Sequence, residues 1–192
     1  YNTALGSGAL RLNTTGANNT AVGGVALENN TTASNNTGLG NEALRANTTG
    51  AQNTAVGSLA LDANTTASNH TAVGYNALAA NTTASNNTAL GDRTLYTNTT
   101  GSENVAVGGL ALYTSNASGN SAFGYSCMQY TTTGGANCGF GYQTLTSNTT
   151  GQNNSAYGKS ALQTNTTGSD NVAIGRDSLL LNEAGNNNVA VG

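Results

Sequence analysis

The chain lacks proline and tryptophan altogether, and it has only two cysteines, one methionine and one histidine among 192 residues. Charged side chains make up 7% of the residues, and the five Lys and Arg lie far apart, so the clustered positive charge that binds nucleic acid is missing. The eight acidic residues are scattered singly, whereas acid–base catalysis needs such groups to converge in a pocket. We therefore expect no enzyme, no cofactor and no nucleic-acid partner. No apolar run approaches the roughly 18 residues of a membrane span, so we expect none in this segment.

What is present is a repeat built from small residues. Asn, Thr, Ala and Gly account for 117 of the 192 residues. Glycines recur every 17 residues from Gly6 to Gly108 and again from Gly124 to Gly192, with one step of 16 between the two series. With this glycine as position 5, the unit reads N-T-A-V-G-x-x-A-L-x-x-N-T-T-G-x-N, and its positions are numbered 1 to 17 below. We expect residues 1–192 to form a single repeat array, a segment of a longer fibrous protein.

The unit length predicts an all-β fold, a parallel β-solenoid (β-roll) of about eleven 17-residue coils. Helical-hairpin repeats need about 33 residues or more, whereas 17 residues suit a coil of two short strands and two turns. Position 4 is always large and apolar and position 9 is Leu in every copy except Met128, so we expect these two columns to form the core. Position 3 is only Ala or Gly, which indicates close packing, and position 8 should point away from the core. Charged residues at positions 7 and 10 should face solvent.

Position 1 is Asn in eleven of its twelve copies, and His70 occupies the twelfth. Identical amides stacked at the coil spacing can hydrogen-bond along the axis, as in cross-β ladders. We interpret this column as a structural Asn ladder, in which His70 still offers a donor and an acceptor. Its members are Asn2, Asn19, Asn36, Asn53, Asn87, Asn104, Asn120, Asn137, Asn154, Asn171 and Asn188.

Position 12 begins an Asn-Thr-Thr turn that is also an N-x-[ST] glycosylation acceptor sequence. The candidate sites are Asn13, Asn30, Asn47, Asn64, Asn81, Asn98, Asn148 and Asn165. A second acceptor series falls at position 17 and comprises Asn18, Asn35, Asn69, Asn86 and Asn153. Two explanations stay open at this point. Either Asn, Thr and Gly simply make good turns, or the turns carry covalent glycans, with O-linked sugar on the Thr columns as a further option.

Residues 109–141 form irregular coils. One coil is a residue short, the next has Thr131 in place of the turn asparagine, and that coil also holds Cys127 and Cys138. A disulfide between these cysteines is possible in an oxidising compartment, and two small buried thiols are the alternative. No third ligand accompanies them, so no metal site is expected.

The segments Asp170–Gly175 (DNVAIG) and Asn187–Gly192 (NNVAVG) resemble the N-[SV]-[VA]-[AI]-[IV]-G signature of YadA-like head repeats of trimeric autotransporter adhesins. Similar arrays occur in phage-tail-fibre-like and environmental β-solenoid surface proteins. The resemblance implies a left-handed parallel β-roll, assembly into a trimeric head, and an adhesive surface held away from a cell. This chain departs from that family in its longer unit and in its additional Asn-Thr-Thr turn. Two modes of self-association are therefore retained as alternatives, a homotrimer and an end-to-end filament.

These patterns together predict a structural or adhesive fibre or surface-filament segment at an extracellular or cell-surface location, with glycans on its turns. The alternative is an ice- or carbohydrate-binding solenoid that uses its Thr columns. Against this alternative, the paired threonines of the turn are adjacent in sequence and should diverge instead of forming one row.

Overall fold

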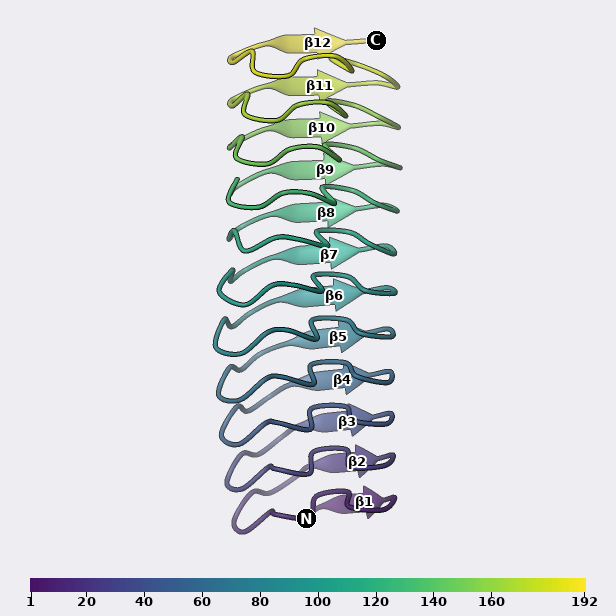
Figure 1. Ribbon diagram of the computed structural model, residues 1–192, viewed down its shortest axis with the longest axis vertical. Helices are drawn as coiled ribbons and strands as arrows, with labels where there is room; N and C mark the ends of the chain where they lie inside the picture. The colour runs from purple at the N-terminus through teal and green to yellow at the C-terminus, as the bar shows by residue number, and fades with distance from the viewer.

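The computed structural model describes all 192 residues and is entirely β-structure and turns. Twelve short strands lie in one sheet, in the order in which they occur along the chain (Figure 1). They are β1 (Thr3–Leu5), β2 (Thr20–Val22), β3 (Thr37–Leu39), β4 (Thr54–Val56), β5 (Thr71–Val73), β6 (Thr88–Leu90), β7 (Val105–Val107), β8 (Ser121–Phe123), β9 (Cys138–Phe140), β10 (Ser155–Tyr157), β11 (Val172–Ile174) and β12 (Val189–Val191). No helix in the structure is able to cross a bilayer.

Every strand pairs in parallel with the next one, in a register set by the repeat. Thr20 of β2 pairs with Thr37 of β3, one 17-residue unit further on. Between β7 and β8 the step is 16, and Val105 pairs with Ser121. The predicted parallel β-solenoid of about eleven coils is therefore confirmed.

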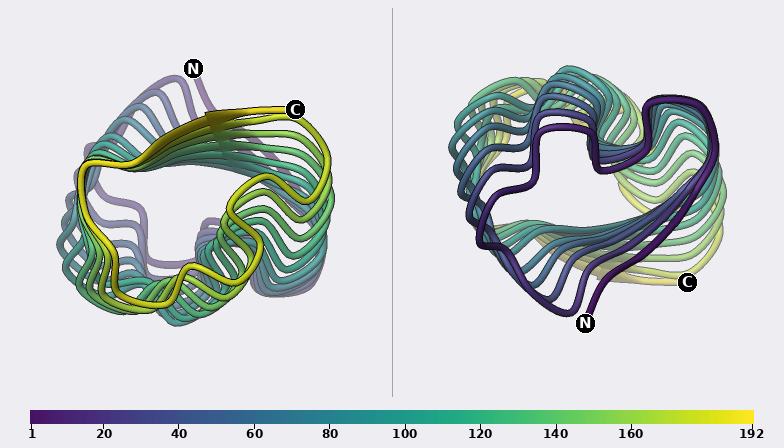
Figure 2. Two further views of the ribbon diagram at one scale, coloured as in Figure 1. Left: turned by 90° about the horizontal axis from the view of Figure 1, so that it is seen from above. Right: turned by 90° about the horizontal axis from the view of Figure 1, so that it is seen from below.

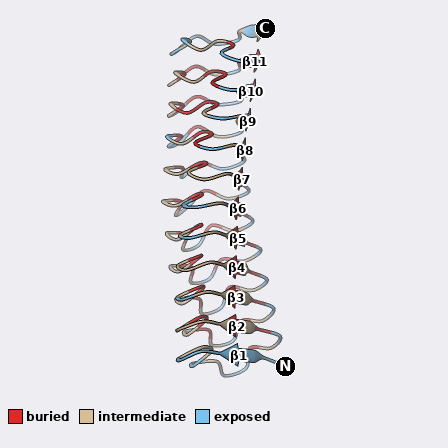
Figure 3. Cartoon of the chain, turned by 90° about the vertical axis from the view of Figure 1, so that its right-hand side faces the viewer, coloured by how far each residue is buried: buried red, intermediate tan, exposed pale blue.

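The coils stack into a rod whose outline, seen along the axis, is a closed loop that rotates gradually from one end to the other (Figure 2). Buried, intermediate and exposed residues alternate along each inner coil, and the first and last coils are mostly exposed (Figure 3). Only 22 of the 126 backbone hydrogen bonds lie within the strands, and the other 104 lie in turns and loops. The turns therefore contribute most of the backbone bonding.

Each coil contains one strand, not the two that were expected. Positions 7 and 9 have positive φ values in every coil, as at Val25 (49°) and Leu27 (51°). An extended strand needs negative φ, so positions 6 to 11 form successive turns. Because the chain is not extended there, positions 8 and 9 both point inward, and Ala26 and Leu27 are both fully buried. The expectation that position 8 points away from the core was wrong.

The core column of the strand is position 3, not position 4. Ala21 is fully buried, whereas its neighbour Val22 is only partly buried, because alternate strand residues point to opposite faces. A Cβ at position 3 already fills the space inside: one added to Gly38 would lie 3.2 Å from the Ala43 carbonyl oxygen and 3.4 Å from Cγ of Leu27, so a larger side chain would clash. The core therefore consists of Ala at positions 3 and 8 and Leu at position 9, and the apolar residues of position 4 lie on the outside. The prediction of a Val–Leu core was right for Leu and wrong for Val.

Candidate functional site: two asparagine ladders and the outer columns

The position 1 asparagines form a continuous column inside the rod. Each Oδ1 accepts the backbone N–H of the next member, as from Asn36 to Asn19 at 2.9 Å. In every asparagine of the column except Asn188, Nδ2 donates to the carbonyl of position 15, as from Asn36 to Gly50 at 2.8 Å. From Asn104 onward, five of the amides also donate to the amide of the preceding member, as from Asn154 Nδ2 to Asn137 Oδ1 at 3.1 Å. The predicted amide-to-amide bonds are thus present in five of the eleven steps, and bonds from amide to backbone run along the whole column.

His70 occupies the same column and is 1% exposed. Its backbone N–H donates to Asn53 Oδ1 at 3.0 Å, and its Nδ1 accepts the N–H of Asn87 at 3.2 Å. Its Nε2 lies 3.2 Å from the Nδ2 of Asn81. Burial lowers the pKa of His70 from 6.5 to about 4. The imidazole is therefore a neutral member of the column near pH 7.

The position 12 asparagines form a second ladder that the sequence did not reveal. Asn47 Nδ2 donates to Asn30 Oδ1 at 2.9 Å and to the Gly50 carbonyl at 2.9 Å. Asn64 Nδ2 in turn donates to Asn47 Oδ1 at 2.9 Å. The ladder supplies its own turn with hydrogen bonds and ties that turn to its neighbours.

This placement corrects the expectation of glycans at position 12. An N-linked glycan is attached to Nδ2, and in these residues Nδ2 lies inside the rod and is already hydrogen-bonded. A sugar there would require breaking the ladder and exposing the turn. The fully buried candidates are Asn30, Asn47, Asn64, Asn81, Asn98, Asn148 and Asn165, and Asn13 in the first coil is partly buried.

The second acceptor series, at position 17, lies on the outside. Its five members, Asn18, Asn35, Asn69, Asn86 and Asn153, are all exposed. They have positive φ, which asparagine tolerates better than most residues. Asparagine therefore suits this turn, although Gln52, Glu103 and Ala136 adopt the same φ at position 17.

The two threonines of the turn differ in their roles. At position 13 the hydroxyl donates to the backbone carbonyl of the next coil, as from Thr65 to Thr82 at 3.2 Å. At position 14, as at Thr66, the side chain is exposed and its hydroxyl has no hydrogen-bond partner in the protein. The adjacent threonines do diverge, as expected.

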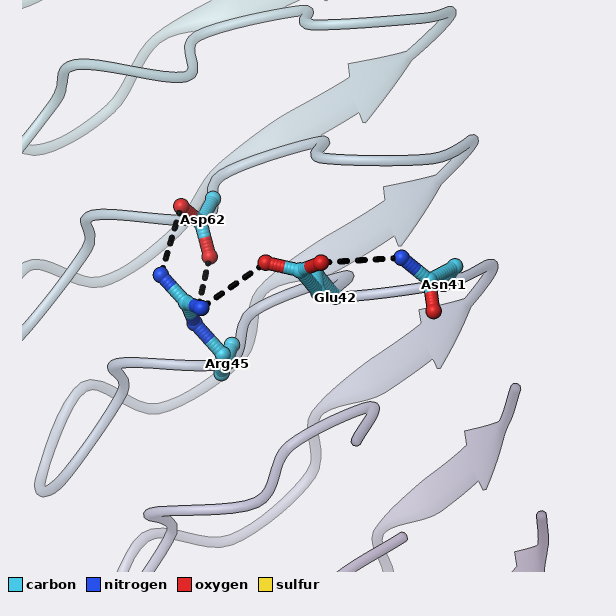
Figure 4. Close-up of polar contacts among 4 residues, drawn as sticks. All are labelled: Asn41, Glu42, Arg45 and Asp62. Atoms are coloured by element: carbon cyan, nitrogen blue, oxygen red, sulfur yellow. Dashed lines mark hydrogen bonds and ion pairs between the residues drawn. The ribbon is translucent and has the colours of Figure 1, made fainter. Parts of the chain in front are cut away.

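The outer surface also carries ion pairs between coils. Arg45 contacts Asp62 of the next coil at 3.0 Å and Glu42 of its own coil at 2.8 Å (Figure 4). The Nε atom of Arg45 forms an ion pair with Asp62 Oδ1 but no hydrogen bond, whereas Nη2 of Arg45 donates a hydrogen bond to Asp62 Oδ2 at 3.2 Å. Burial raises the pKa of Asp62, and the Arg45 charge opposes that rise. All seven charged residues of positions 7 and 10 lie on the outer surface, as expected, but four of them, including Asp62, are partly buried.

The outer face of the sheet consists of the position 2 and position 4 columns, neither of which contains a charge. Position 2 is Thr on six consecutive strands, β1 to β6, and these hydroxyls have no protein partner. Position 4 carries an aromatic stack on β8 to β10, in which the Phe123 and Phe140 rings are 4.5 Å apart and nearly parallel. Phe140 and Tyr157 continue the stack at 5.2 Å. The ring faces cover one another, and the ring edges point outward.

The irregular coils hold the two cysteines on opposite sides of the coil wall, and both thiols are free. Cys127 is fully buried with its Sγ 3.4 Å from the Gly139 carbonyl, and burial raises the pKa of its thiol to about 12. Cys138 lies on the outer strand face, where its Sγ is 3.4 Å from the Tyr157 hydroxyl. Cys127 and Cys138 thus form no disulfide in the structure. Of the two thiols that the alternative expected to be buried, only that of Cys127 is.

The missing residue of the short coil is position 14. Asn116 compensates, because its Oδ1 accepts the backbone N–H of Thr99 at 2.8 Å and the Thr99 hydroxyl at 2.9 Å. These are the bonds that a position 13 carbonyl accepts elsewhere, as Thr65 does from Thr48. A side chain therefore substitutes for the shortened backbone.

Comparison with known proteins gave no match to any family model, to any curated protein or to any solved structure. The structure contains no pocket and no group of three or more His, Cys, Asp or Glu residues that could hold a metal ion.

Proposed function

We propose that this chain is a rigid segment of an extracellular or cell-surface fibre, whose function depends on its shape and on the surface it displays. The observation that supports the proposal is the single sheet, in which each strand pairs with the next at a fixed register. Two internal amide ladders run beside that sheet. Coils that depend on their neighbours in this way form a stiff rod.

The experiment is electron microscopy of the purified chain together with surface labelling of the cells that make it. At about 4.8 Å per coil, eleven steps give a rod about 50 Å long. Antibodies against the chain should label intact cells. A chain of other dimensions, or label that appears only after the cells are opened, would contradict the proposal.

Self-association belongs to the same proposal and has a defined candidate surface. The outer sheet face exposes apolar side chains, including Leu90 (36% exposed), Phe140 (37%) and Ile174 (43%). Contiguous exposed apolar area of this kind marks interaction surfaces. Native mass spectrometry distinguishes a homotrimer from an open-ended filament. Ile174→Lys on this face should release subunits, whereas Asp177→Lys on the neighbouring turn should not.

A second candidate function, ice binding, is favoured by one observation. The hydroxyls of the position 2 threonines on β1 to β6 are free and form an uncharged row beside the apolar position 4 column. On each of these strands the threonine of position 2 and the Val or Leu of position 4 point to the same outer face. The two adjacent threonines of the turn, by contrast, point in different directions. Thermal hysteresis of the dilute protein tests this function, with Thr54→Lys as the disruptive variant and Thr49→Lys on the turn as the control. Absence of hysteresis in the unaltered protein would remove it.

A further inference from the structure

The position 14 threonines form the most uniform outward column of the rod. Their side chains are exposed in every coil that has one, and their hydroxyls have no partner in the protein. The column comprises Thr15, Thr32, Thr49, Thr66, Thr83, Thr100, Thr133, Thr150 and Thr167. Of the eleven turns, only the short coil and the last coil, with Ala184, lack it.

Local structure does not require threonine at this position. In six of the nine coils the backbone N–H of position 14 bonds to the next coil, as from Thr49 to the Thr65 carbonyl at 3.2 Å, and any residue except proline could make that bond. Thr66, Thr83 and Thr100 make no such bond. By contrast, the threonine hydroxyl of position 13 does bond to the next coil. The side chain at position 14 has no such task.

Other outward columns vary in residue type where the structure does not require a particular side chain. Position 6 contains Gly, Ser, Asn, Asp, Tyr, Lys and Arg, and position 10 contains Arg, Glu, Asp, Ala, Tyr, Gln, Thr and Leu. Position 2 is Thr only as far as β6, and β-propensity explains Thr there. Position 14 keeps its hydroxyl in both halves of the chain. The uniform presence of an exposed, uncommitted hydroxyl therefore indicates a use outside the fold.

We propose that the position 14 threonines are attachment sites for O-linked glycans, one per coil along one edge of the rod. This inference rests on the proposed extracellular fibre, and it moves the covalent sugar from the buried asparagine of the turn to its exposed threonine. In the reaction, Thr Oγ1 attacks the anomeric carbon of a nucleotide-activated sugar. The Oγ1–carbon bond forms, the bond from the anomeric carbon to the phosphate oxygen breaks, the nucleotide leaves, and the hydroxyl proton passes to a base of the transferase.

A neutral sugar suits this column better than phosphate does. Neighbouring coils lie about 4.8 Å apart, and each phosphate would carry a charge of about −1.5 to −2 near pH 7. The whole chain has only five Lys and Arg to offset such a row. Uncharged groups at the same spacing do not repel one another in this way.

The test uses the chain purified from the cells that make it. Its intact mass should exceed the bare 19.0 kDa, and mild alkali should release the sugar with the threonine oxygen and leave dehydrobutyrine at position 14. A bare mass would overturn the inference, and so would sugar found only at position 13, at position 2 or on the position 17 asparagines. A rod on the cell surface without sugar would leave the proposed function intact, whereas a modified chain that is not a rod would contradict that function instead.

Two matched variants made in the same cells separate modification from folding. Thr66→Val removes the exposed hydroxyl, and we expect it to lose the sugar of one coil with no change in thermal unfolding. Thr65→Val removes the hydroxyl that bonds to Thr82, and we expect it to lower stability while the sugar on Thr66 remains. If Thr66→Val leaves the glycan mass unchanged, the attachment site is not position 14.

Discussion

The Nδ1 atom of His70 accepts the backbone N–H of Asn87 at 3.2 Å, where every other coil uses an asparagine Oδ1 for the same bond. Only the neutral imidazole has a lone pair for this contact. Protonation would place an N–H against an N–H inside the rod. Burial of the imidazole lowers the pKa of His70 to about 4, so the neutral form that this contact needs prevails.

The rod should therefore lose stability in acid. Because the folded-state pKa is lower than the unfolded value of 6.5, the unfolded chain binds more protons between the two values. The His70 contribution is fully present above pH 6.5 and is lost progressively as the pH falls toward 4. The difference between the two pKa values corresponds to a loss of about 3 kcal/mol of unfolding free energy once the pH is below both. Urea unfolding at pH 7.5, 6, 5 and 4 measures this loss of stability.

His70→Asn is the matched control, because it restores the residue found in all other copies of the column. Carboxylates titrate in both proteins, so the difference between the two stability curves isolates the histidine. Above pH 6.5 the unfolding free energies of the two proteins should change with pH in parallel. Below pH 6.5 the protein with His70 should lose stability faster than the His70→Asn variant. A constant difference from pH 4 to 7.5 would show that His70 does not sense pH.

Asn47→Asp should destabilise the rod by at least about 3 kcal/mol at pH 7, since it replaces two donated hydrogen bonds with a buried, unpaired charge. The lost bonds are those to Asn30 and to the Gly50 carbonyl. Asn35→Asp, the same change at an exposed turn position, should alter stability by less than about 0.5 kcal/mol. Chemical denaturation of both variants decides. Equal effects would mean that the position 12 ladder is not a structural element.

The repeat length and the small-residue columns were sufficient to predict the parallel solenoid, its register and the buried Leu column. They could not show which strand face points inward, because Ala21 and Val22 are both apolar and only the space beside Leu27 decides between them. Nor could they show that Leu27 adopts a left-handed φ of 51°, a conformation that leucine rarely takes. The Asn-Thr-Thr turn was the harder case. A turn asparagine and a glycosylation acceptor have the same sequence, and only the burial of Asn47 separates them.

Gly57→Ala should be severely destabilising, by more than about 3 kcal/mol. Gly57 has a φ of 131°, and an added Cβ would lie 2.5 Å from the carbonyl oxygen of Gly74 in the next coil, so backbone would have to move. Gly109→Ala is the control, because a Cβ there would make an ordinary 3.5 Å contact with the ring of Tyr125. Thermal unfolding should show a large shift for Gly57→Ala and almost none for Gly109→Ala. Similar shifts for the two would rule out the close approach of coils as the reason for glycine at position 5.

Thr131→Asn should stabilise the rod, because it repairs a break in the position 12 ladder. Thr131 is fully buried and its Oγ1 has no hydrogen-bond partner. In the next coil, Asn148 Nδ2 donates only to the Gly151 carbonyl, so one of its two hydrogens is unused. An asparagine at 131 would accept that hydrogen and donate to its own turn, which should add about 1–3 kcal/mol. Thr132→Asn, one residue further on, removes the bond from the Thr132 hydroxyl to Thr149 and should give no gain. If the two variants unfold at the same urea concentration, the unpaired hydroxyl of Thr131 is not a cost to the fold.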